Sequence, residues 1–222
     1  MTAHVLGNGP SISLFKRDEW PETDIFIGCN FSDEETLRPD YTVMIDIRPM
    51  RKFYEGHKVG VPMVLSDRAE KFILDKKGWD DMNNRGAIIL KEIVPLLKYK
   101  DLHPKWALNS GQHAAMYALD KEDITDLHIW GTDTFWGNAL KSNTDAIIRP
   151  NAGDRVRIDI ADPWRKFWER IFEEHPNHTF YIHAPKDSQL HQDYKLDNVK
   201  VVFHEEVVDY YEEHKCEGQD DE

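Results

Sequence analysis

At 222 residues, the chain is long enough for one large domain with a substantial hydrophobic core. Hydrophobic residues make up 40% and charged residues 31% of the sequence, a balance typical of a soluble globular protein, and no apolar run reaches the length of a membrane span. The formal net charge is −13, and the sequence shows no basic face of the kind that nucleic-acid binders have. This charge disfavours nucleic acids and anionic membranes as partners. An anionic small molecule remains compatible with this charge, because backbone dipoles can dominate the field inside a cleft.

The start of the chain and its two cysteines predict a cytoplasmic protein. The start, MTAHVLGNG, has neither the basic nor the apolar region of a signal peptide. Cys29 and Cys216 share no motif typical of a disulfide framework or a zinc site, which favours a reduced compartment. Residues 1–216 are expected to form a single α/β domain, and residues 217–222 an acidic, disordered tail.

Short apolar runs alternate with longer amphipathic ones along the chain. The apolar runs predict strands at residues 4–6, 24–30, 41–47, 61–65, 105–109, 126–131, 179–184 and 199–204. The amphipathic runs predict helices at residues 10–17, 66–75, 85–97, 111–120 and 163–175. This alternation predicts an α/β fold, a Rossmann-like domain with a mostly parallel sheet flanked by helices. Ligands of such sheets bind at the carboxyl ends of the strands, so the residues after each strand are the candidates for function.

The first predicted strand runs directly into Gly7, Asn8, Gly9, Pro10 and Ser11. Glycine allows a close backbone approach, and proline suits the first position of a helix. A serine hydroxyl at a helix N-terminus can join the N–H groups that favour anions. The segment lacks the Gly-Lys-Ser/Thr of a P-loop and the third glycine of a dinucleotide fingerprint, where Ile12 stands. By itself the segment is equally consistent with a phosphate cradle and with a plain turn.

Other predicted strands also end in small or polar residues. These residues are Asn30, Asp46, Ser110 with Gly111, and Thr132 with Asp133. Asn30 can bind a base or ribose, or cap a turn. Asp46 can bind a ribose or a metal ion, or cap the next helix, and Ser110 can be an N-cap or a second anion site. Together these strand ends favour a ligand site at one edge of the sheet.

The motifs LGNGPS, GCN, MID, NSG and LHIWGTDTFWG, in this order, resemble those of a group of Rossmann-like bacterial and archaeal proteins. The group includes short bacterial sialyltransferases, motility-accessory-factor glycosyltransferases and 6-hydroxymethylpterin pyrophosphokinases. The resemblance covers about residues 3–137, with a thinner match at TFYIHAPKDS, and residues 52–105 carry little of it. It implies that residues 1–216 form a single nucleotide-binding domain.

The resemblance also implies roles for individual residues. Asn8, Gly9 and Asn30 would contact the nucleotide, and Ser110 would approach the phosphates or the transferred group. Asp46 stands where the sialyltransferases usually have asparagine. The full set of expected nucleotide-binding residues is Gly7, Asn8, Gly9, Pro10, Ser11, Asn30, Asp46, Ser110, Gly111 and Thr132.

The chain departs from the sialyltransferases at the catalytic base. Their histidine before the last long helix has no counterpart in GDRVRIDIADPWRKFW, where Asp159 or Asp162 is the available carboxylate. Asp133 matches the aspartate of the family's Gly-x-Asp motif, so Asp133 and Asp159 are the expected catalytic residues. The family's paired tyrosines after this motif and its arginine before Ser-Gly are also absent. These departures disfavour sialyl transfer itself.

Three functions remain open at this point. The first is a glycosyltransferase-like protein that binds a nucleotide or nucleotide sugar, needs no cofactor and transfers a sugar to an unknown acceptor. The second is a pyrophosphokinase-like enzyme that uses ATP and magnesium, with Asp46 and Asp133 sharing the ion. The third is a non-catalytic nucleotide-binding module. The brevity of the chain also suggests a phage-encoded relative.

Remaining polar residues give weaker indications. The histidines at positions 175, 178, 183 and 191 fit no zinc motif, so surface and strand-end positions are expected for them. Only His183 is expected to face the cleft. Arg155 and Arg157 could pair with a phosphate or with surface carboxylates. Neither Ser11 nor Ser110 lies in the Gly-x-Ser-x-Gly motif of a serine hydrolase.

Overall fold

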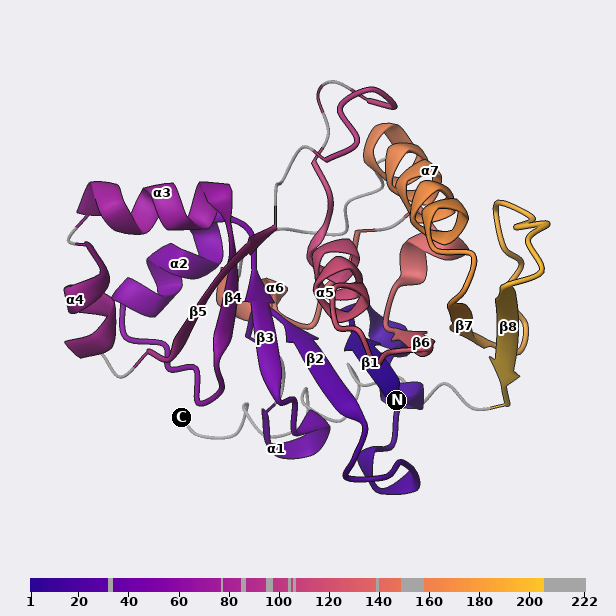
Figure 1. The fold of residues 1–222 in the computed structure, drawn as a ribbon, viewed down its shortest axis with the longest axis horizontal. Helices are drawn as coiled ribbons and strands as arrows, with labels where there is room; N and C mark the ends of the chain where they lie inside the picture. Colours follow the sequence, from indigo (N-terminus) through magenta and orange to yellow (C-terminus); the bar gives the residue numbers. More distant parts are fainter. Residues whose placement is uncertain are drawn as a thin grey trace, which may run out of the picture.

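A computed structural model of the chain describes residues 1–31, 34–76, 78–84, 87–94, 98–103, 105, 107–138, 140–148 and 158–205. Eight strands form one sheet in the order β5-β4-β3-β2-β1-β6-β7-β8, and every neighbouring pair is parallel (Figure 1). The predicted fold class is confirmed: the chain forms an α/β Rossmann-like domain. The predicted tail, residues 217–222, lies outside the described residues.

The elements follow the predicted alternation. The strands are β1 Thr2–Leu6, β2 Ile25–Cys29, β3 Tyr41–Met44, β4 Met63–Ser66, β5 Ile89–Val94, β6 Asp126–Trp130, β7 Thr179–Pro185 and β8 Val199–His204. The α-helices are α1 Glu34–Leu37, α2 Ile47–Tyr54, α3 Asp67–Lys76, α4 Gly78–Asn84, α5 Ser110–Leu119, α6 Asp145–Ile148 and α7 Ile158–Glu174. The described residues also form the short 3₁₀ helices η1 Pro10–Leu14, η2 Arg17–Glu19 and η3 Asp133–Phe135. None of the helices in these described segments combines the length and the apolar character needed to cross a membrane.

Two of the predicted elements are wrong. The helix expected at 85–97 is replaced by β5, and the described part of the strand expected at 105–109 is irregular. The run AIILKEIVPLL satisfies both helical and strand spacing, and here pairing of Ile89 with Met63 of β4 decides for the strand. Residues 107–109 lead into α5, where Asn109 takes the extended N-cap conformation.

Other boundaries also differ from the prediction. The helix expected at 10–17 is divided into η1 and η2. Asp46 occupies the N-cap position of α2 instead of ending a strand, but its side chain makes no capping hydrogen bond to the helix. The helix expected at 163–175 begins earlier, at Ile158, so that Pro163 lies inside it. Proline suits the first turn of a helix and therefore predicts a start at Pro163, but Pro163 is the sixth residue of α7.

The sheet is covered on both faces. Neighbouring residues of a strand face opposite sides, and their packing identifies the layers. Val43 and Val64 belong to the core beneath α5 and α7, whereas Met44 and Leu65 belong to the core beneath α2 and α3. A third cluster, which includes Leu6, lies beneath η1 on this second face. The sheet is therefore buried on both sides, as its apolar strands require.

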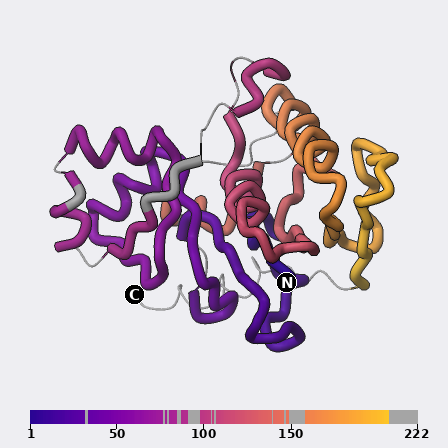
Figure 2. Tube along the Cα trace, viewed as in Figure 1, coloured from indigo at the N-terminus to yellow at the C-terminus, as the bar shows by residue number. Residues whose placement is uncertain are grey.

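The strand order reverses at β1. Strands β2 to β5 extend the sheet on one side of β1, and β6 to β8 extend it on the other. Figure 2 shows this reversal as a change from purple on one side of the domain to orange and yellow on the other. The crevice between the carboxyl ends of β1 and β6 is the switch point at which such sheets bind ligands.

α5 lies against the middle of the sheet and is buried from Gly111 to Leu119. Ala114 and Ala115 are fully buried, and their small side chains allow the helix to approach β1, β2 and β3 closely. This close approach fixes the position of the N-terminus of α5 at the switch point.

We expect Ala115→Leu to destabilise the protein by about 1–3 kcal/mol, because a leucine cannot fit between α5 and the sheet without displacing packed atoms. Urea unfolding at neutral pH measures the loss. Lys71→Leu, which puts the same side chain on an exposed position of α3, should change the free energy of unfolding by no more than about 0.5 kcal/mol. Equal effects of the two variants would contradict the packing described here.

Candidate functional site

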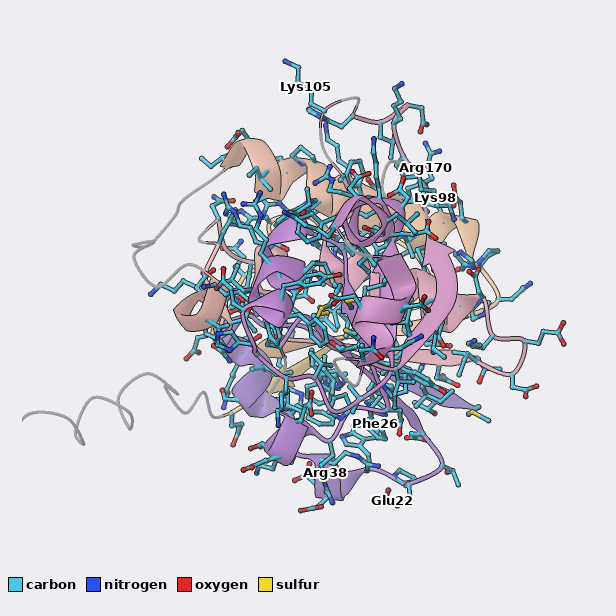
Figure 3. All side chains as sticks on the ribbon, turned by 90° about the vertical axis from the view of Figure 1, so that its left-hand side faces the viewer. Glu22, Phe26, Arg38, Lys98, Lys105 and Arg170 are labelled. Carbon is cyan, nitrogen blue, oxygen red and sulfur yellow. The ribbon has the colours of Figure 1, made fainter. Side chains whose placement is uncertain are left out.

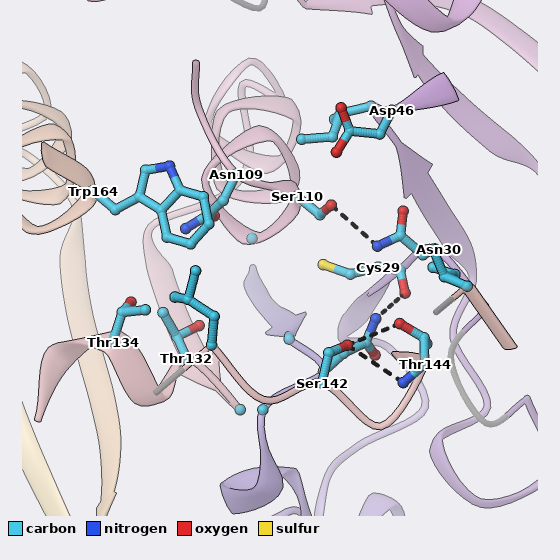
Figure 4. A pocket seen from close by; sticks show the side chains of 18 of the residues that line it. Cys29, Asn30, Asp46, Asn109, Ser110, Thr132, Thr134, Ser142, Thr144 and Trp164 are labelled. Atoms are coloured by element: carbon cyan, nitrogen blue, oxygen red, sulfur yellow. Dashed lines mark hydrogen bonds between the residues drawn. The ribbon is translucent and has the colours of Figure 1, made fainter. Parts of the chain in front are cut away.

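A cavity of about 490 Å³ opens at the switch point. Its walls come from the turns after β1, β2, β3 and β6, from the N-terminus of α5, from residues 140–148 and from the start of α7 (Figure 4). Of the expected nucleotide-binding residues, those that line it are Gly7, Asn8, Gly9, Asn30, Asp46, Ser110, Gly111 and Thr132. Pro10 and Ser11 belong to η1 and are not part of the lining. The volume suits a small-molecule ligand.

The turn after β1 is hydrogen-bonded to the turn after β6. The Gly7 N–H donates to the Trp130 carbonyl at 2.9 Å, and the Gly9 N–H donates to the Gly131 carbonyl at 2.8 Å. These bonds continue the pairing of β1 with β6 beyond the ends of both strands. Consequently the glycine N–H groups that a phosphate cradle would use are already occupied by backbone carbonyls.

Glycine is required on both sides of this contact. A Cβ on Gly7 would lie 2.5 Å from the Gly131 oxygen, and a Cβ on Gly131 would lie 2.5 Å from the Gly7 oxygen. Gly131 also has a φ of +59°, a conformation that side chains rarely adopt. A Cβ on Gly9 would come within 2.7 Å of Asp133 and of the Gly131 oxygen. The two glycine motifs are therefore complementary halves of one backbone contact.

Asp133 closes this contact through Ser11. The Ser11 hydroxyl donates to Oδ1 of Asp133, and the Ser11 N–H donates to Oδ2 at 3.2 Å. Burial raises the pKa of Asp133, and the hydrogen bonds from Ser11 act in the opposite direction. The carboxylate thus occupies the N-terminal end of η1, where the sequence suggested a site for an external anion.

The N-terminus of α5 offers a different anion site. Asn109 and Gln112 form a capping box: the Asn109 side chain accepts from the Gln112 N–H, and the Gln112 side chain accepts from the Asn109 N–H. The N–H groups of Ser110 and Gly111 have no acceptor among the described residues, and both residues line the cavity. Two backbone donors and the positive end of the helix dipole therefore face the ligand space.

Asn30 lies beside the start of α5 in an unusual conformation. Its φ is +56°, a left-handed value that asparagine tolerates better than most residues. Nδ2 donates to the Ser110 hydroxyl at 3.3 Å, as drawn in Figure 4, whereas the buried Oδ1 has no partner among the described residues. A buried amide oxygen without a partner favours a ligand that brings a donor.

Asn8 and Cys29 contribute to the wall rather than to chemistry. The Asn8 side chain donates to the Cys29 carbonyl, which joins the turn after β1 to the end of β2. Burial raises the pKa of the Cys29 thiol to about 12, so this thiol stays protonated at neutral pH and is not a nucleophile.

Cations at the rim of the cavity were not predicted as site residues. Arg48 comes from α2, Arg68 from α3 and Lys141 from the segment before α6. Arg68 pairs with Asp46 at 3.1 Å, and both side chains are about half exposed. Arg48 follows the expected strand end closely, which is a signal that sequence analysis could have used, but Arg68 reaches the cavity only through the packing of α3.

The remaining predicted residues lie elsewhere. Asp159 is exposed on the first turn of α7 and is not part of the lining, although the neighbouring Ile160 is. Arg155 and Arg157 lie outside the described residues. His183, expected to face the cleft, instead lies on the covered face of the sheet between His128 and a further histidine, His204, because β7 directs it away from α5 and α7.

Comparisons of the chain with models of protein families, with curated protein sequences and with solved structures found no match. The chemistry of the cavity is therefore inferred from its own groups. Backbone donors lie at one end of α5, the Asn30 amide oxygen beside them has no partner within the described part of the chain, and cations lie at the rim. This combination suits an anionic ligand that also carries hydrogen-bond donors.

Gly131→Ala tests the backbone contact between the two turns. We expect it to destabilise the protein by at least about 2 kcal/mol more than Gly78→Ala, measured by urea unfolding. Both glycines have a positive φ, but a Cβ at Gly131 meets the Gly7 oxygen, whereas a Cβ at Gly78 meets nothing within 4 Å. If the two variants lose the same stability, the contact between the turns does not contribute as described.

Proposed function

We propose that this protein binds a nucleotide or nucleotide sugar in the switch-point cavity and acts as a glycosyltransferase-like enzyme that passes the sugar to an acceptor. The observation that carries the proposal is the pair of backbone N–H groups, of Ser110 and Gly111, that face the cavity without an acceptor among the described residues. A phosphate group bound there would accept both hydrogen bonds and would lie at the positive end of the α5 dipole.

The nucleoside part would lie against Asn30. Its amide oxygen, which no described residue binds, can accept a hydrogen bond from a ribose hydroxyl or from an amino group of a base. Arg48, Arg68 and Lys141 at the rim offset the net charge of −13 where an anion would enter. The motif resemblance supports the same class of ligand, because its glycine, asparagine and Ser-Gly motifs line one cavity.

Asp133 is the proposed base for the acceptor hydroxyl. Of the two aspartates expected from the sequence, it is the one that lines the cavity, and burial raises the pKa of its carboxyl, which makes the carboxylate a stronger base. Ser11 keeps the carboxylate in position through two hydrogen bonds. Transfer would require the acceptor to share one of the carboxylate oxygens with Ser11.

The magnesium-dependent alternative has less support. The two aspartates expected to share the ion already have partners, Arg68 for Asp46 and Ser11 for Asp133. Across the described segments, no group of three or more His, Cys, Asp or Glu side chains could hold a metal ion. Magnesium bound here would take most of its ligands from phosphate oxygens and water. The non-catalytic alternative shares the same cavity and differs only in turnover.

Ser110→Pro tests the anion site without removing α5. Ser110 is the first residue of the helix, where proline is favoured, and Asn109 before it has the extended conformation that proline requires of its neighbour (φ −84°, ψ 173°). The variant lacks one N–H donor and should bind CMP, UDP or GDP at least about tenfold more weakly, as measured by calorimetry. Ser110→Ala removes only the hydroxyl and should lose less.

The identity of the ligand is tested on the unaltered chain. A thermal-shift panel of CMP, CDP, UDP, GDP, ADP and ATP, each with and without magnesium, is followed by donor turnover with the nucleotide that raises the melting temperature. Stabilisation that does not depend on magnesium, together with sugar release or transfer, supports the proposal. Stabilisation by ATP only with magnesium would support the pyrophosphokinase alternative, and binding without turnover would support the non-catalytic module. If no nucleotide stabilises the protein, the proposed ligand class is wrong.

A further inference from the structure

Four histidines form a row on the sheet face opposite α5, outside the cavity. His4 on β1, His128 on β6, His183 on β7 and His204 at the end of β8 follow one another across four adjacent strands. The first three expose 0%, 9% and 3% of their surface. Neighbouring rings lie close together, with centroids 4.9 Å apart for the first pair and 5.1 Å apart for each of the next two. We refer to these four residues as the imidazole row.

A short segment, residues 16–22, covers the imidazole row and is called the strap here. The ring of Trp20 in the strap contacts those of His4 and His128 at steep interplanar angles of 63° and 61°, with centroids 4.4 and 4.7 Å apart. Arg17 lies over the ring of Phe26 at 3.7 Å. Figure 3 shows Phe26 and Glu22 on the opposite side of the domain from Lys98 and Arg170, which belong to the side of α5 and α7. The strap and the imidazole row therefore form a layer separate from the cavity wall of α5.

Three of the rings form a hydrogen-bonded chain. His128 Nδ1 lies 2.8 Å from His183 Nε2, and His183 Nδ1 lies 2.8 Å from His204 Nε2. Each of these two contacts is a hydrogen bond only if one of its two nitrogens carries a proton, and each neutral imidazole carries one proton. One extra proton on the chain can be accommodated with both contacts intact. Two extra protons cannot, because at least one contact would then place N–H against N–H.

His4 is restricted in a different way. The Trp130 indole N–H donates to His4 Nδ1 at 3.3 Å, and His4 Nε2 lies 3.1 Å from Asp24 Oδ2. An indole nitrogen can only donate, so Nδ1 is the acceptor and the proton of His4 resides on Nε2. Protonation of His4 at Nδ1 would place the new N–H against the indole N–H. The geometry therefore holds His4 neutral.

The charges around the imidazole row do not compensate for its burial. Burial lowers the pKa of His4 to about 3, His128 to about 4 and His183 to about 2, and it also lowers the pKa of His204. The groups that face the row from the neighbouring elements are Arg17, Lys16 and Glu19 of the strap, Asp24 before β2, Asp126 of β6, Tyr181 of β7 and Lys200 of β8. The cations Arg17 and Lys16 add to the effect of burial, and Asp126 and Glu19 oppose it.

The strap itself is weakly attached through polar groups. Arg17 donates to the Trp20 carbonyl at 3.1 Å and to Glu22 at 2.9 Å, so both of these bonds stay within the strap. Arg38, outside the strap, donates to the Asp18 carboxylate, but both side chains are exposed and such surface ion pairs contribute little. Arg17 Nε and Trp20 Nε1 are buried and have no acceptor among the described residues. Release of the strap would allow water to accept hydrogen bonds from both donors. The attachment of the strap therefore depends mainly on Trp20 packing against the neutral imidazoles and on Arg17 packing over Phe26.

We propose that the imidazole row is an acid-sensitive latch that holds the strap on the sheet. With neutral rings the strap stays closed. Uptake of one proton by His4, or of two protons by the hydrogen-bonded rings of His128, His183 and His204, breaks a hydrogen bond and places positive charge beneath Trp20. This change releases the strap and exposes Trp20 and Trp130. This inference is independent of the ligand proposed for the cavity.

The direction of the pH dependence follows from proton binding. The released rings take up protons near their ordinary pKa of 6.5, whereas the closed rings do so only at lower pH. The closed form is therefore fully favoured above pH 6.5 and is lost as the pH falls from 6.5 towards the lowered values. The opening equilibrium should rise about tenfold per pH unit for each proton that the released form takes up.

Hydrogen exchange of the full chain, followed by mass spectrometry from pH 7.5 to pH 5 and corrected for intrinsic exchange rates, tests the latch. We expect the strap to lose protection at a higher pH than β1, β2 and β6, with opening about tenfold greater per pH unit per proton. Unchanged protection of the strap, or loss of protection in the strap and the central strands at the same pH, would overturn the proposal.

His204→Gln removes the most accessible ring of the row while keeping a group that can donate and accept. At pH 5.5 it should reduce the opening of the strap by up to about tenfold relative to the unaltered chain, with little change at pH 7.5. His191→Gln, at an exposed position outside the row, is the matched control and should leave the pH profile unchanged. Identical profiles of the two variants would contradict the latch. If His204→Gln does not fold, the exchange profile of the unaltered chain still decides.

Discussion

The backbone contact between the turns after β1 and β6 determines the architecture of the whole site. Gly7 and Gly9 donate to carbonyls at the end of β6, and Asp133 completes the junction through Ser11. Because both turns approach backbone against backbone, neither glycine motif can carry a side chain there. The switch point is therefore closed at its base by the protein itself, and a ligand has to lie above this junction, against the end of α5.

This arrangement divides the polar groups of the cavity into two kinds. The donors of the first turn are used for structure, whereas the donors of Ser110 and Gly111 face the cavity. The capping box of Asn109 and Gln112 makes this division possible, because it satisfies the next N–H of the helix and keeps the first two directed at the ligand space. Hydrogen-bonding capacity is thus concentrated at a single helix end.

The sequence predicted the fold class because its strands alternate clearly with helices, and it predicted the cavity because parallel strands end at one edge. The predictions were less successful where tertiary packing decides. AIILKEIV fits a helix or a strand equally well, and pairing with β4 makes it a strand. Spacing could not show that Asp133 would bind Ser11, 122 residues away, or that four histidines on different strands would meet. Arg68 likewise reaches the rim only because α3 packs beside α2.

The position of β1 at the centre of the sheet has a consequence for synthesis on the ribosome. One edge of this strand pairs with β2 soon after it emerges, but its other edge needs β6, which begins at Asp126. At ~5–20 residues per second, the ribosome needs roughly 6 to 25 s to make the intervening chain. During this interval the first half of the protein presents an unpaired, apolar strand edge, which is a template for association with other chains. Nascent chains of this protein are therefore expected to depend on cotranslational shielding until the second half of the sheet is complete.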